Sequence, residues 1–119
     1  MRKAFAHEAV VVLAAGGDER APGGAITVEL CGGWEHEGPC PLAAHHTAVS
    51  PGADGGLLLR VLFAAEPADE AAVRARIDAA LAAGALGREP APDTRWELRA
   101  SGPSPVREDE AGHAARLSG

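Results

Sequence analysis

The chain of 119 residues has few aromatic and amide side chains. Aromatic residues make up 3% of it, and tyrosine, asparagine and glutamine are absent. Much of the 46% hydrophobic fraction is alanine, so a core must come from a few clusters of Val, Ile and Leu. The length suits one domain with one core and is too small for two. We therefore expect a single small domain.

Positive charge is scarce as well. The chain has eleven basic and seventeen acidic residues, which gives a formal net charge of −6, and Lys3 is the only lysine. This charge repels phosphate backbones, so we expect no nucleic-acid partner. The apolar run at residues 9–15 is too short to span a membrane and lacks the layout of a signal peptide. We therefore expect no membrane partner and a cytoplasmic location.

Cysteine is limited to two residues, and both lie in one stretch of sixteen residues with three of the five histidines. These five side chains are Cys31, His36, Cys40, His45 and His46. Thiolate and imidazole are the ligands that zinc and copper prefer. In a reducing compartment two nearby cysteines favour thiols or metal ligands over a permanent disulfide. The cluster therefore predicts a metal site, with zinc as the metal.

The spacing predicts how four of these residues would come together. Cys31, His36, Cys40 and His45 are separated by four, three and four residues, so a strand, a glycine-containing loop and the next strand would bring them around one ion. Adjacent residues of a strand point to opposite faces, so only one of the two neighbouring histidines joins. A slip of one residue would replace His45 by His46.

Other interpretations of the cluster stay open. The two cysteines could be free thiols, or could form a disulfide that closes a short loop. Glu35 and Glu37 flank His36 as outer partners, or as a direct ligand if one histidine drops out, which would leave an open and catalytic site. Trp34, beside the cluster, is expected to pack under the loop rather than to line a pocket.

Hydrophobic periodicity predicts five strands and one main helix. The strands are expected at residues 7–13, 25–31, 44–49, 57–63 and 94–100, and the alternation of residues 25–31 puts Cys31 on a polar face. In the strand at 57–63, alternate residues should face the core, namely Leu57, Leu59, Val61 and Phe63. Trp96 is also expected in the core.

The helix is expected from Pro67 to Ala83, because Pro opens it and Gly84 follows its last alanines. Four of its residues form an apolar stripe, namely Val73, Ile77, Ala80 and Leu81. Arg74 stands four residues from both Glu70 and Asp78, and we interpret these charges as a solvated face rather than a site.

The predicted fold class is α+β, with a mainly antiparallel sheet of about five strands and one main helix packed on one face. Residues 1–100 would form the single domain, and residues 101–119 a flexible tail or a marginal C-terminal helix. His7 and His113 lie far from the cluster in sequence, and we interpret them as exposed or capping residues unless the fold brings them in, and assign them no role. An open sheet face could support a homodimer.

The function that follows from the sequence is a small soluble zinc-binding domain with a structural or partner-binding role. In this hypothesis the ligands are Cys31, His36, Cys40 and His45, and the partner is an unknown protein. Two alternatives remain: a small enzyme that uses an open metal site or a reactive thiolate, and a metal-free protein-interaction domain. Catalysis has no motif in its favour, so a non-enzymatic role is preferred.

Overall fold

The computed structural model describes residues 2–31, 44–52, 55–88 and 91–118. In chain order, its elements are β1 (Lys3–Leu13), α1 (Ala21–Cys31), β2 (Ala44–Pro51), β3 (Leu57–Ala65), the 3-10 helix η2 (Pro67–Asp69), α2 (Glu70–Ala82), β4 (Ala85–Arg88), β5 (Ala91–Ser104), the 3-10 helix η3 (Glu108–Glu110) and α3 (Ala111–Ser118). In this part of the chain, no helix has the length and apolar character needed to cross a membrane.

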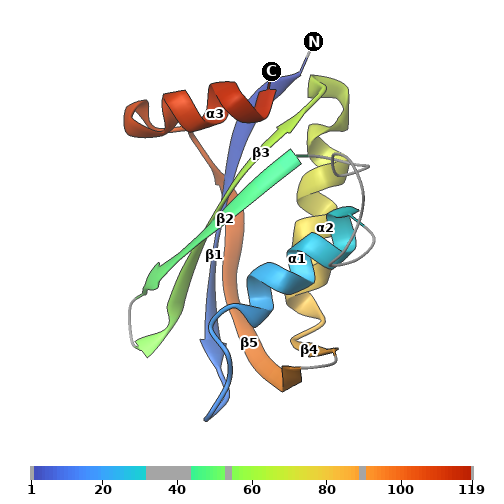
Figure 1. Cartoon of the computed structure of the whole chain (residues 1–119), viewed down its shortest axis with the longest axis vertical. Coiled ribbons are helices and arrows are strands. Elements are labelled where there is room, and N and C mark those ends of the chain that lie inside the picture. Colours follow the sequence, from blue (N-terminus) through green and yellow to red (C-terminus); the bar gives the residue numbers. More distant parts are fainter. Residues whose placement is uncertain (1, 32–43, 53–54, 89–90, 119) are drawn as a thin grey trace.

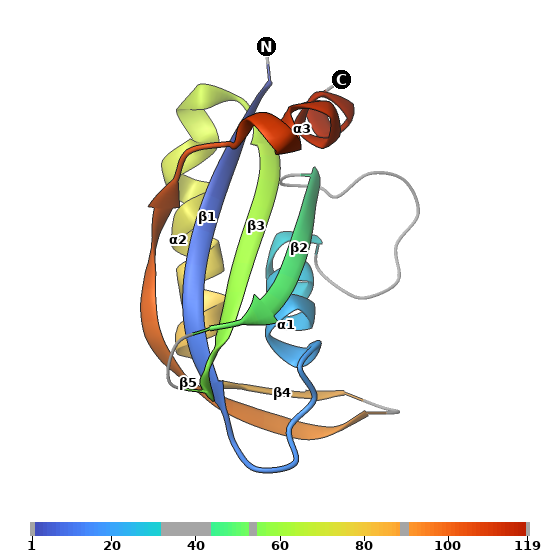
Figure 2. The ribbon, with the colours of Figure 1, turned by 90° about the vertical axis from the view of Figure 1, so that its left-hand side faces the viewer.

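The strands form one sheet in the order β2-β3-β1-β5-β4, and each strand is antiparallel to its neighbours. Helices α1 and α2 lie on one face of the sheet, while α3 lies across one end of the other face (Figures 1 and 2). We call these the helix face and the outer face. The path β1-α1-β2-β3-α2-β5 is a split β-α-β arrangement to which β4 is added. The predicted α+β class with an antiparallel sheet of five strands is confirmed.

Strand β3 lies inside the sheet between β1 and β2, and its sequence is apolar except for one arginine. Leu59, Val61 and Phe63 are buried in the core on the helix face, as predicted, and Leu57 packs against that core while partly exposed. Residues on the outer face of β3 are buried too, since α3 covers part of that face. An interior strand covered on both sides explains the nearly continuous apolar run.

Helix α2 confirms the predicted helix, with η2 forming its first turn. Its buried residues are the predicted stripe of Val73, Ile77, Ala80 and Leu81. The chain then turns at Gly84, whose φ is 71°. Trp96 on β5 fixes this end, because its backbone N–H donates to the Gly84 carbonyl at 2.9 Å and its indole N–H donates to the Leu81 carbonyl at 2.9 Å. Trp96 is buried in the core, as predicted.

The prediction of a strand at residues 25–31 is wrong, because this segment belongs to helix α1. The alternation of Ile26, Val28 and Leu30 suggested a strand, but a spacing of four residues fits both a strand and a helix. Ile26 and Leu30 are fully buried whereas Val28 is partly exposed, which is the helical pattern. Two glycines make α1 a poor helix by propensity, so its packing against α2 must hold it.

The end of the chain is ordered against the sheet. Strand β5 continues to Ser104, beyond the strand end predicted at residue 100, and α3 then packs over β3 and β1 on the outer face. Ala114 of α3 is buried there, with 5% of its surface exposed. A chain segment that looks polar and proline-rich in sequence therefore contributes both a strand end and a covering helix.

Candidate functional site

The candidate metal ligands lie around the connection from α1 to β2. Helix α1 ends at Cys31, and β2 begins at Ala44, close to that helix end (Figure 2). His36 and Cys40 lie between the two elements, outside the described residues, as do Trp34, Glu35 and Glu37. Because the strand at residues 25–31 is a helix, the expected hairpin is replaced by a helix-to-strand connection.

His45 points from β2 toward α1. Its Nε2 lies 3.1 Å from the Thr27 hydroxyl, and that hydroxyl donates its proton to the Gly23 carbonyl at 3.2 Å. Thr27 lies one helical turn before Cys31. The first and last predicted ligands in sequence thus belong to neighbouring segments.

His46 points the other way, to the outer face, where its ring contacts that of His113 on α3. The two ring centres are 4.7 Å apart, and the ring planes are inclined at 54°. The expected divergence of His45 and His46 is therefore observed. Within the described ranges, no three Cys, His, Asp or Glu side chains gather closely enough to hold a metal ion.

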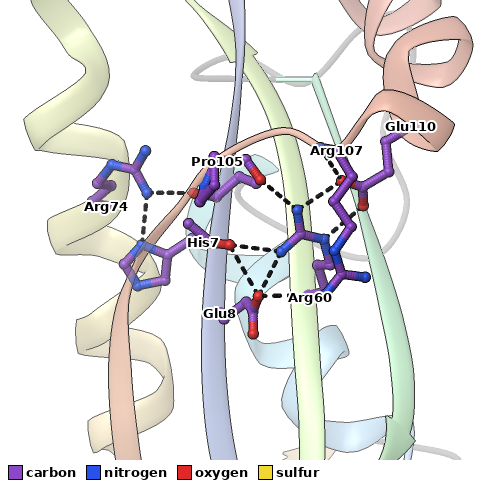
Figure 3. A network of polar contacts seen from close by, with 9 residues as sticks. His7, Glu8, Arg60, Arg74, Pro105, Arg107 and Glu110 are labelled. Atoms are coloured by element: carbon purple, nitrogen blue, oxygen red, sulfur yellow. Dashed lines mark hydrogen bonds and ion pairs between the residues drawn. The ribbon is translucent and has the colours of Figure 1, made fainter.

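A second polar cluster surrounds His7, which is buried with 2% of its side chain exposed. The prediction that His7 is exposed or caps an element is therefore wrong. Its Nε2 lies 2.8 Å from the Ser101 hydroxyl and 3.1 Å from Asp78 Oδ1, and Ser101 also donates a short hydrogen bond to Asp78. Arg74 Nη1 lies 3.0 Å from His7 Nδ1, and Figure 3 shows this contact.

The presence of Ser, His and Asp suggests a hydrolase triad, but the hydrogen bonds exclude one in this arrangement. Arg74 can only donate, so His7 Nδ1 accepts and Nε2 carries the proton. A general base needs the opposite arrangement, in which the nitrogen beside the serine is unprotonated and the aspartate holds the other nitrogen. His7 therefore cannot take the proton of Ser101, and the cluster holds β1, β5 and α2 together.

The pKa of His7 agrees with this neutral state. Burial lowers the pKa below its ordinary value of 6.5, although the hydrogen bond and charge of Asp78 raise it, and the charge of Arg74 lowers it further. Arg74 also pairs with Glu70 at 2.8 Å and lies over the rings of Phe5 and Phe63. Only 14% of its side chain is exposed, so the prediction that these charges form a solvated face is wrong for Arg74.

A third polar cluster lies on the outer face, around the one charged residue of β3 (Figure 3). Arg60 is 7% exposed and donates from all three guanidinium nitrogens, to Glu110 at 2.6 and 2.7 Å, Glu8 at 2.6 Å, Ser104 at 2.8 Å and the Pro105 carbonyl at 2.7 Å. These bonds account for its five N–H groups. Arg60 therefore ties the C-terminal segment to the sheet and has no donor left for a ligand.

A surface hollow of about 360 Å³ lies beside this cluster, between β1, β3 and β5. Val10, Leu58 and Ala100 are among its apolar lining residues. Its one carboxylate, Glu8, is held by Arg60 and by Ser104. With its charge already paired, the hollow offers little chemistry of its own.

Sequence reasoning missed His7 and the buried arginines because it treated each charge by its neighbours along the chain. His7 alternates with Phe5, Ala9 and Val11, which pack in or against the core, so the two-residue period of a strand could have placed it inside.

Comparison of the chain with family models, with curated proteins and with solved structures found no match. Function must therefore be inferred from the chemistry of these side chains.

Proposed function

We propose that the protein is a zinc-binding domain in which Cys31, His36, Cys40 and His45 hold the metal. The observation that supports this is the contact of His45 with Thr27, one helical turn before Cys31. It places the strand that carries the last ligand beside the helix that ends at the first. Two thiolates and two imidazoles are a common tetrahedral zinc set.

Electrostatics at the end of α1 also favours a cation. The carbonyl groups in the last turn of a helix carry a partial negative charge, and a basic side chain often balances it. Helix α1 has no basic residue of its own in its last turn, and the charge of Glu29 there is already paired with Arg76 of α2 at 3.4 Å. A zinc ion bound next to Cys31 would supply the missing positive charge.

The role that fits such a site is structural, with a surface for a protein partner formed by the connection from α1 to β2. The metal would tie a weak helix to the edge strand of the sheet, and binding free energy would become folding free energy. Ligation by thiolates goes with a reducing, cytoplasmic location. Among the described residues, the polar cluster at His7 gives no support to the enzyme alternative.

Elemental and native mass spectrometry of the protein as purified tests the proposal. We expect about one zinc per chain, and we expect Cys31→Ser and His45→Gln each to lose it. His46→Gln is the matched control, because the ring of His46 faces α3 rather than α1, so this variant should keep the zinc that the cysteines bind. Counting reactive thiols with and without a chelator gives a second readout, since bound thiolates react only after the metal is removed. Metal-free protein with an unchanged fold would refute the proposal.

A further inference from the structure

The contact of His46 with His113 joins two elements that are far apart in the sequence. His46 lies on β2, whose register is fixed by pairing with β3, and His113 lies on α3. His46 is exposed and His113 is half-buried, so solvent ions reach the pair. The Arg60–Glu110 ion pair anchors the chain immediately before α3, so both rings are carried by fixed segments.

The separation of the two ring centres matches that of two imidazole ligands of one metal ion. A late transition metal lies in the plane of each imidazole, about 2.0 to 2.1 Å from nitrogen and thus about 3.2 Å from the ring centre. With a ligand angle of about 90 to 110° at the metal, the ring centres are then about 4.5 to 5.2 Å apart. The observed separation is 4.7 Å. Stacked parallel rings could not share an ion in both planes, whereas ring planes inclined at 54° meet along a line on which an ion can lie.

We propose that His46 and His113 form a second metal site, for a divalent late transition metal ion that prefers imidazole, with water completing its coordination. Copper(II) should bind most tightly, because the affinity of nitrogen ligands for divalent ions is highest at copper. The site lies on the outer face and is independent of the zinc proposal, which concerns the helix side of β2. An ion bound here would fasten α3 to the edge strand.

Titration of copper(II) into the full chain with Cys31→Ser and Cys40→Ser tests this site without interference from thiols. Calorimetry should give one copper ion per chain, and electron paramagnetic resonance should show nitrogen ligands. His46→Phe and His113→Phe, which keep a ring at each position, should each weaken binding at least tenfold. Ser50→Ala, at an exposed position of the same strand, is the matched control and should bind copper as the parent does.

A second measurement uses no variant of the pair. Copper(II) at a small fraction of the protein concentration should broaden the ring signals of His46 and His113 first in NMR spectra, because a paramagnetic ion relaxes the nuclei nearest to it. Absence of saturable copper binding, unchanged affinity in both Phe variants, or first broadening at other histidines would overturn the proposal. Circular dichroism of each variant confirms that the fold is retained.

Discussion

Glu110 holds the C-terminal segment against the sheet through Arg60, and its removal should be costly in a pH-dependent way. Its carboxylate accepts from Arg60 at 2.6 and 2.7 Å and from the Arg107 backbone N–H at 2.8 Å. The pKa of Glu110 is lowered from 4.5 to about 2, chiefly by the hydrogen bonds from Arg60; burial opposes the shift, while the backbone bond from Arg107 and the charges of both arginines contribute to it. We expect Glu110→Gln to remove the stability that this carboxylate contributes.

The magnitude follows from the two pKa values. A fall in the pKa from 4.5 to about 2 corresponds to about 3 kcal/mol of folding free energy, because each pKa unit is worth about 1.4 kcal/mol. Solvent at the exposed 16% of the side chain screens part of this, so we expect Glu110→Gln to cost about 2 kcal/mol at pH 7. That is a large share of the stability of a small domain.

The sign of the pH dependence is fixed because the folded pKa lies below the unfolded one. The contribution of Glu110 is complete above about pH 5 and is lost as the pH falls from about 4.5 toward 2, since the unfolded chain binds the proton first. The difference in unfolding free energy between the parent and Glu110→Gln should therefore fall to less than half at about pH 3.

Urea unfolding followed by circular dichroism measures this difference at each pH. Glu108→Gln is the matched control, because Glu108 is exposed on the same 3-10 turn, and its cost at pH 7 should be within about 0.5 kcal/mol of zero. The reasoning would be refuted if Glu110→Gln cost no more than Glu108→Gln at pH 7, or if its cost were the same at pH 3 as at pH 7.

Three further predictions concern stability. In urea unfolding, Gly84→Ala should cost about 2 kcal/mol and Gly16→Ala about 1 kcal/mol. Both glycines have a positive φ, but only at Gly84 would a Cβ meet a backbone oxygen, that of Trp96, at 3.0 Å. Equal costs would contradict this. Thr47→Val should raise stability by up to about 1 kcal/mol, because this buried hydroxyl has no hydrogen-bond partner among the described residues; a loss would indicate a partner. Stability should also fall as the pH drops below 6.5, where the unfolded chain protonates His7 before the folded one does; an NMR titration midpoint of 6.5 or higher would exclude this cause.

The elements that could be predicted from the sequence are those whose signal does not depend on distant partners. Helix α2 has a proline at its start, a glycine after its end and four apolar residues at helical spacing, so the helix and its buried face both follow from local chemistry. Strand β3 is a continuous apolar run between turns. The α+β class follows from such segments, while the strand order depends on contacts between residues far apart.

Helix α1 could not be recognised in this way, because local signals favoured other structures. Gly23 and Gly24 weaken a helix. Ile26 and Leu30 are four residues apart, a spacing that fits the periodicity of a strand as well as that of a helix. Pro22 near the start was the one local sign of a helix, and burial of Pro22 shows that packing decides the outcome. The buried cations were missed for a related reason, since Arg60 donates to Glu8, Ser104, Pro105 and Glu110, and Arg74 contacts Ala6 and His7, all of them on other segments of the chain.

Because residues 25–31 belong to a helix and not to the predicted strand, a bound metal would have a different effect on this protein. In a hairpin, Cys31 and His45 would be neighbours within one sheet, and a bound ion would add little to a structure already joined by backbone hydrogen bonds. Here the two belong to different layers, a helix and the edge strand β2. Between Thr27 and His45 a hydrogen bond already joins those layers. Since α1 depends on packing rather than on propensity, an ion that fastens its end to β2 would stabilise the element that needs it most.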